Sequence, residues 1–198
     1  MAINLANNNS LANITALPSS ISGGAMTLLA TQTASGSANL SFTSGIDDTY
    51  DSYVFKFYDI HASAGSPFTV NFRDGGTAYD ATKTTTFFAS YHAEDNSSAN
   101  LVYGSGEDLA QSTGTQQLNY NMGTANDESL SGQLFLYNPS STTFVKHFMA
   151  TTNLYQGTYS QEIFVAGYCN TTTAIDGVQF KLNSGNIDSG VIKLYGVS

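Results

Sequence analysis

Apolar and polar residues alternate with a period of two along most of the chain. The pattern is clearest in GIDDTYDSYVFKFYDI, from Gly45 to Ile60, where Tyr53, Phe55 and Phe57 fall on one face. Aromatic residues two positions apart fit a pleated strand, whereas the apolar face of a helix repeats every three or four residues. Aromatic and β-branched side chains also favour half-buried sheet surfaces. The stretch therefore predicts a long central strand of about ten residues.

Similar runs follow at short intervals up to the last residues. The predicted strands cover residues 27–33, 37–43, 50–60, 68–73, 84–91, 131–137, 143–151, 161–170, 175–182 and 189–197, with short strands near Leu101 and Gln117. Phe68, Val70 and Phe72 should point inward on one of them, which Asp74-Gly75-Gly76 closes with a hairpin-type turn. Residues 92–127 are polar and predict loops, with one helical turn at residues 107–111. The fold class expected is all-β: an antiparallel β-sandwich, jelly-roll-like, of roughly ten strands.

The first 26 residues differ from the remainder because they contain no Phe, no Tyr and no charged side chain. Ser10 could cap a short helical turn that Pro18 ends, and Gly23-Gly24 is typical of a hinge. Such a segment cannot bury enough surface to order itself. It could pack on its own domain or dock on a neighbouring chain, through its apolar residues Leu5, Leu11, Ile14, Leu17 and Ile21. We therefore divide the chain into an attachment arm, residues 1–26, and a β-sandwich domain, residues 27–198.

Composition narrows the classes of function. The 198 residues fit one domain, and 12 Phe with 12 Tyr supply a substantial core. Only 6 basic side chains stand against 15 acidic ones, which gives a net charge of −9. Binding to nucleic acid or to an anionic membrane needs clustered Lys and Arg, so neither partner is expected. The single cysteine excludes an intrachain disulfide and fits synthesis in a reducing compartment.

No catalytic, cofactor or metal residue is assigned from the sequence. His61, His92 and His147 lack the spacing of zinc ligands, and no GxSxG motif supports a serine nucleophile. Cys169 lies in an apolar strand, where a buried and inert thiol is expected. Acidic pairs occur in predicted turns or loops, and none has the spacing of a calcium loop; they are Asp47-Asp48, Glu94-Asp95, Glu107-Asp108 and Asp127-Glu128.

Sugar binding is the main binding function to weigh. Loops that carry tyrosine beside amide side chains could stack on a glycan and hydrogen-bond to it. The candidate contacts are Asn119, Tyr120, Asn121, Tyr155 and Tyr159. The alternative is that these tyrosines only cover the ends of the sandwich, which the absence of tryptophan favours.

Three segments together carry a resemblance to a known class of protein. They are SFTSGIDDTYDSYVFKFYDI from Ser41 to Ile60, NPSSTTFVKHF from Asn138 to Phe148, and SGNIDSGVIKLYGVS at the end. The pattern resembles small β-rich virion structural proteins of tailed bacteriophages, especially marine and cyanobacterial phages. SLANITALPSSISGG, from Ser10 to Gly24, is similar to their N-terminal attachment segments. Residues 93–137 match least well.

The resemblance implies a non-enzymatic tail-fibre, capsid-fibre or decoration-like protein that is made in the host cytoplasm and assembled into the virion. Its arm would bind capsid or tail proteins, and its domain would face outward without any cofactor. A homo-oligomer is expected, and by analogy a trimer. The alternative function is a receptor-binding adhesin that recognises host-surface glycan. A glycan-cleaving enzyme is the least favoured hypothesis.

Overall fold

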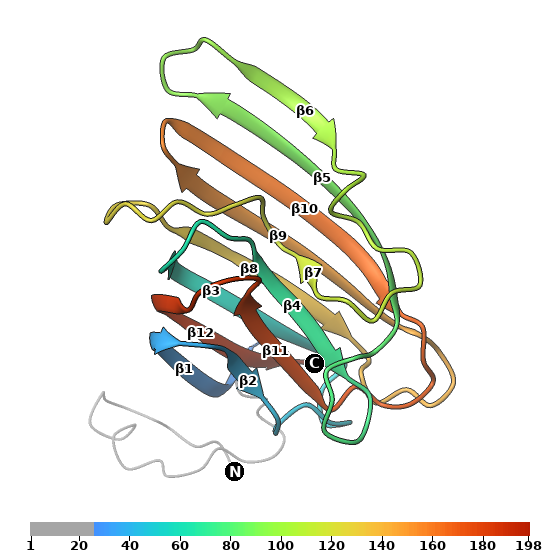
Figure 1. The fold of residues 1–198 in the computed structure, drawn as a ribbon. Coiled ribbons are helices and arrows are strands. Elements are labelled where there is room, and N and C mark those ends of the chain that lie inside the picture. Colours follow the sequence, from blue (N-terminus) through green and yellow to red (C-terminus); the bar gives the residue numbers. More distant parts are fainter. Residues whose placement is uncertain (1–25) are drawn as a thin grey trace, which may run out of the picture.

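A computed structural model describes residues 26–198, which form twelve strands in two antiparallel sheets (Figure 1). The strands are β1 (Thr27–Ser37), β2 (Leu40–Phe42), β3 (Ser52–Ala62), β4 (Phe68–Arg73), β5 (Lys83–Ala93), β6 (Ala99–Tyr103), β7 (Gln116–Gln117), β8 (Leu130–Tyr137), β9 (Lys146–Gln156), β10 (Tyr159–Cys169), β11 (Gly177–Leu182) and β12 (Ile187–Val197). The predicted all-β sandwich is confirmed, with twelve strands in place of roughly ten. The arm residues Leu5, Leu11, Ile14, Leu17 and Ile21 lie outside the described residues.

The strand pairing is nested in the manner of a jelly roll. The first strand pairs with the last, β2 with β11, β3 with β8, and β4 with β7, all of them antiparallel. The large sheet has the order β1-β12-β3-β8-β9-β10-β5-β6, and the small sheet has the order β2-β11-β4-β7. Strands β9, β10, β5 and β6 therefore extend the large sheet beyond the jelly roll, and we call them the extension. The predicted jelly-roll character is confirmed.

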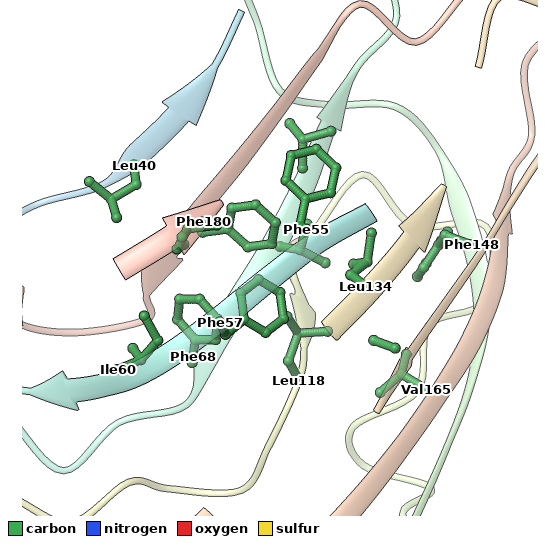
Figure 2. Close-up of a cluster of buried hydrophobic side chains, with 14 of the residues drawn as sticks. Leu40, Phe55, Phe57, Ile60, Phe68, Leu118, Leu134, Phe148, Val165 and Phe180 are labelled. Atoms are coloured by element: carbon green, nitrogen blue, oxygen red, sulfur yellow. The ribbon is translucent and has the colours of Figure 1, made fainter. Parts of the chain in front are cut away.

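Aromatic side chains from both sheets fill the space between them (Figure 2). Phe180 of β11 is fully buried, with its ring centroid 5.2 Å from that of Phe55 and 5.1 Å from that of Phe57. Phe68 of β4 stacks on Phe180 from within the small sheet, at 5.7 Å. The alternation seen in residues 45–60 thus places Phe55 and Phe57 in the core. Such aromatic contacts add to the free energy gained by burying apolar area.

Residues 104–129, between β6 and β8, cover the inner face of the extension, which the narrower small sheet does not reach (Figure 1), and we call them the covering segment. Leu118 and Met122 bury their side chains there. The Thr152 hydroxyl donates to the Leu118 carbonyl oxygen at 2.6 Å, and the Thr85 hydroxyl donates to Gln116 Oε1 at 2.6 Å. Hydrogen bonds from strand threonines therefore hold a segment whose composition alone indicated only loops.

Residues 107–111 do not form the expected helical turn. The Glu107 N–H bonds to the Gly104 carbonyl in a simple turn, at 3.3 Å. The following backbone then runs beside β5, where the Leu109 carbonyl accepts the Thr85 N–H at 2.9 Å. Its backbone groups pair with a strand and are not available for a helix. In the described part of the chain, no helix is long and apolar enough to cross a membrane.

Candidate functional site

A small hollow of about 310 Å³ opens at the end of the extension, on the face that turns toward the small sheet. Its lining combines aromatic rings with hydroxyl and amide groups: Tyr91, Ser98, Tyr120, Tyr159 and Gln161. Tyr91 of β5 and Gln161 of β10 stand directly opposite each other in the strand register. Ser98 comes from the β5–β6 connection, and Tyr120 comes from the covering segment. Three stretches far apart in sequence therefore build the hollow: residues 91–98, residue 120 and residues 159–161.

The tyrosine rings are held by edge-to-face contacts. The ring centroids of Tyr91 and Tyr159 lie 5.9 Å apart, with an interplanar angle of 79°. Tyr120 packs its ring against the buried Phe87, at 5.1 Å between centroids. Burial raises the pKa of the Tyr120 hydroxyl above its ordinary value, and the nearby Glu107 carboxylate raises it further. The hydroxyl therefore stays protonated at neutral pH, able both to donate and to accept hydrogen bonds.

Gln161 places an unpaired hydrogen-bond acceptor beside the hollow. Its Nε2 donates weakly to Gln156 Oε1 at 3.3 Å, whereas its own Oε1 is buried without a partner. Within residues 26–198, the only other buried side-chain polar atom without a partner is Asn119 Nδ2. An unpaired buried acceptor costs free energy, which a ligand hydroxyl that donates to it would recover.

The structure brings two of the predicted glycan contacts together and separates the rest. Tyr120 and Tyr159 both line the hollow. Tyr155 pairs with Ser160, the strand neighbour of Tyr159, so its side chain lies on the opposite face of the sheet. Asn119 is fully buried and accepts the Phe68 N–H at 2.7 Å, which makes it a structural residue. Asn121 is exposed and does not line the hollow.

Sequence reasoning missed Tyr91, Ser98 and Gln161. Tyr91 and Gln161 sit within predicted strands, where a tyrosine or glutamine is usually assigned to the sheet surface. A signal was present for Gln161, because it is in phase with the inward residues Ile163 and Val165 on the same strand. The convergence of these residues depends on the pairing of β5 with β10, which local sequence does not specify.

A second cluster, buried at the opposite end of the extension, joins two lysines to the cysteine. Cys169 pairs with Lys83 on one side and Lys146 on the other, and all three side chains are fully buried. Lys83 Nζ donates to Asn71 Oδ1 at 2.5 Å and to the Ala81 carbonyl at 2.9 Å, and Lys146 Nζ donates to the Thr171 carbonyl at 3.0 Å. Burial raises the pKa of the Cys169 thiol to about 12. The thiol is therefore neutral near pH 7, as expected for an inert cysteine.

A third group, between β3 and β12, gathers His61, Asp188 and Glu128 beside a polar hollow of about 390 Å³. His61 Nδ1 lies 3.3 Å from Asp188 Oδ2. The Glu128 carboxylate accepts the N–H groups of Ala125 at 2.8 Å and Gly157 at 2.6 Å, and these bonds hold its pKa below the ordinary value. In residues 26–198, no cluster of three or more His, Cys, Asp or Glu side chains is placed to hold a metal ion. Glu128 thus serves to tie the covering segment to the β9–β10 turn.

No protein-family model matches the chain, and no curated protein is similar to it. The geometry of the tyrosine hollow is therefore the most direct guide to binding. Flat aromatic faces suit the apolar faces of sugar rings, and the Gln161 oxygen suits a hydroxyl donor. The hollow is the candidate functional site.

Proposed function

We propose that the protein is a non-enzymatic structural protein of a bacteriophage virion. The observation that carries the proposal is the nested jelly-roll pairing, an architecture that viral capsid domains share with lectins. Two of the segments that resemble virion proteins also fall on adjoining strands, because β3 ends the first segment and pairs with β12 in the last. Residues 1–26 would attach the chain to capsid or tail proteins, and the sandwich would face outward.

The proposal is tested on particles of the phage that encodes the chain. Mass spectrometry should find the chain in purified virions in a fixed ratio to the major capsid protein, and cryo-electron microscopy should show its density on the capsid or the tail. A variant that lacks residues 1–26 should fold, because the described core begins after them, yet it should not join particles. Absence of the full chain from virions would overturn the proposal, and incorporation of the shortened chain would refute attachment through the arm.

A second candidate function is recognition of host-surface glycan through the tyrosine hollow. The observation that favours it is the buried, unpartnered Gln161 Oε1 beside three tyrosine side chains. Recognition by stacking and a few hydrogen bonds would make this a weak site, with affinity raised by the many copies on a particle.

A glycan array with the full chain tests this function. Tyr91→Ala and Tyr159→Ala should each weaken binding about tenfold, because each removes about 1–1.5 kcal/mol of ring contact. Gln161→Leu should weaken binding by a similar factor, because it removes the Oε1 acceptor. Tyr155→Ala is the matched control, since Tyr155 lies on the opposite face and should keep wild-type binding. Equal losses in the control and the hollow variants would count against the site.

A further inference from the structure

Among residues 26–198, no strand pairs with the outer edge of β6, which ends the large sheet on one side (Figure 1). The Gly104 N–H donates to the Phe87 carbonyl at 2.9 Å, and the Ala93 N–H donates to the Ser98 carbonyl at 2.8 Å. Even-numbered residues of this segment therefore face β5. Because the direction alternates along an antiparallel strand, Ala99, Leu101 and Tyr103 turn their N–H and C=O groups away from the sheet.

The side chains of β6 do nothing to prevent pairing with another chain. Edge strands are usually protected by charged residues, proline or a covering segment. The sequence of β6 is ANLVY, with no charge and no proline, and Leu101 and Tyr103 are 68% and 57% exposed. Both side chains share a face with Phe88, which pairs with Tyr103 and stacks on Phe164 with centroids 4.9 Å apart. An apolar cluster thus reaches the free edge.

We propose that β6 pairs antiparallel with β6 of a second copy of the chain, across a two-fold axis at Leu101, so that two large sheets become one. Leu101 would face Leu101 of the other copy, and Ala99 would face Tyr103. In this register every outward N–H meets an outward C=O, because pairing about a two-fold axis is self-complementary. The apolar clusters of the two copies then lie side by side and bury each other.

A second copy is the occupant that the edge fits best. It brings a strand of the same length, itself free of charged residues, with the same apolar face. The pairing closes with two copies, so it gives a dimer where analogy with phage fibres suggested a trimer. The proposed pairing of β6 strands does not depend on whether the protein belongs to a virion.

In the unpaired chain, the Asn100 side chain occupies one backbone donor of the free edge of β6. Its Oδ1 accepts the outward Leu101 N–H at 2.9 Å, so it occupies the donor that would lie on the axis. Dimer formation must exchange this side-chain bond for one to the other copy. Replacing Asn100 with alanine should therefore tighten the dimer, whereas loss of the Leu101 N–H should weaken it.

Sedimentation equilibrium on the full chain and its variants tests the proposal. The wild type should form dimers, and Leu101→Pro should raise the dissociation constant at least tenfold. Proline is tolerated there because the missing N–H does not bond to β5. Asn100→Ala should lower the constant severalfold. Phe144→Ala is the matched control, since Phe144 is as exposed as Leu101, at 69%, but lies outside the strands.

Amide hydrogen exchange locates the interface. The amides of Ala99, Leu101 and Tyr103 should exchange more slowly as protein concentration rises, and no such change should occur in Leu101→Pro. If that variant fails to fold, Leu101→Lys takes its place, because it sets like charges against each other across the axis. A monomer at all concentrations, a trimer, or a dimer unaffected by changes at Leu101 would overturn the proposal.

Discussion

At the scale of single residues, the burial of Lys83 and Lys146 costs free energy, because a buried ammonium group loses its hydration. Within residues 26–198, Lys83 forms no ion pair with a carboxylate and relies on two neutral oxygens, Asn71 Oδ1 and the Ala81 carbonyl. Burial lowers its pKa from 10.5 to about 8. Its burial was not predicted from the sequence, although Lys83 is in phase with the inward Thr85 and Phe87. The phase could be read from the sequence, but one of the two oxygens that make burial tolerable belongs to Asn71, on a strand of the other sheet, and local sequence does not specify how the sheets pack.

The lowered pKa makes stability depend on pH in a definite direction. Between about pH 8 and 10.5, the unfolded chain keeps a proton on Lys83 that the folded chain has lost, so stability rises with pH. From pH 7.5 to 9.5 the gain from this group should be about 2 kcal/mol. Urea unfolding at both pH values should show that Lys83→Met loses this part of the gain. Lys193→Met, on the outer face of the sheet, should keep it; equal gains in all three proteins would refute the assignment.

At the scale of elements, the period of two predicted the jelly-roll strands well, but it failed at one position of β3. Phe57 points inward, and the next inward residue is Ile60, three positions later. The register shifts there against both neighbours, because Asp59 adopts a φ of 49° and forms a bulge. The order of strands could not be predicted either. The tyrosine hollow depends on β10 pairing with β5, and short-range patterns carry no information on such distant pairing.

Gly190 is what allows β12 to pass this bulge. Its φ is 123°, and a Cβ there would lie 2.8 Å from both the Asp59 carbonyl oxygen and Ile60 Cα. Gly190→Ala should therefore lower the free energy of unfolding by about 2–4 kcal/mol, from backbone strain and overpacking together. Gly106→Ala is the matched control: a Cβ there meets nothing within 4 Å, so its effect should stay within about 0.5 kcal/mol. Thermal and urea unfolding of the two variants measure both effects, and similar losses would argue against the close approach.

At the scale of the whole molecule, charge opposes association and the free edge favours it. The chain carries a net charge of −9. Lys83 and Lys146 are buried, and Arg73 is paired with Asp176 at 2.7 Å, so few cations remain on the surface to balance the carboxylates. Two copies that approach through β6 must therefore overcome repulsion between two acidic bodies, with an uncharged strand at the contact.

This balance predicts how salt affects the dimer proposed above. Raising the salt concentration from 0.01 to 0.15 M shortens the screening length from about 30 Å to about 8 Å, which weakens the repulsion between copies. The contact between the β6 strands is uncharged, so its own contribution to the binding free energy changes little with salt. Sedimentation equilibrium should therefore show a dimer that tightens at least threefold over this range, while Leu101→Pro stays largely monomeric. An interface built on ion pairs would respond in the opposite way, so a dimer that dissociates as salt rises would place the contact elsewhere on the surface.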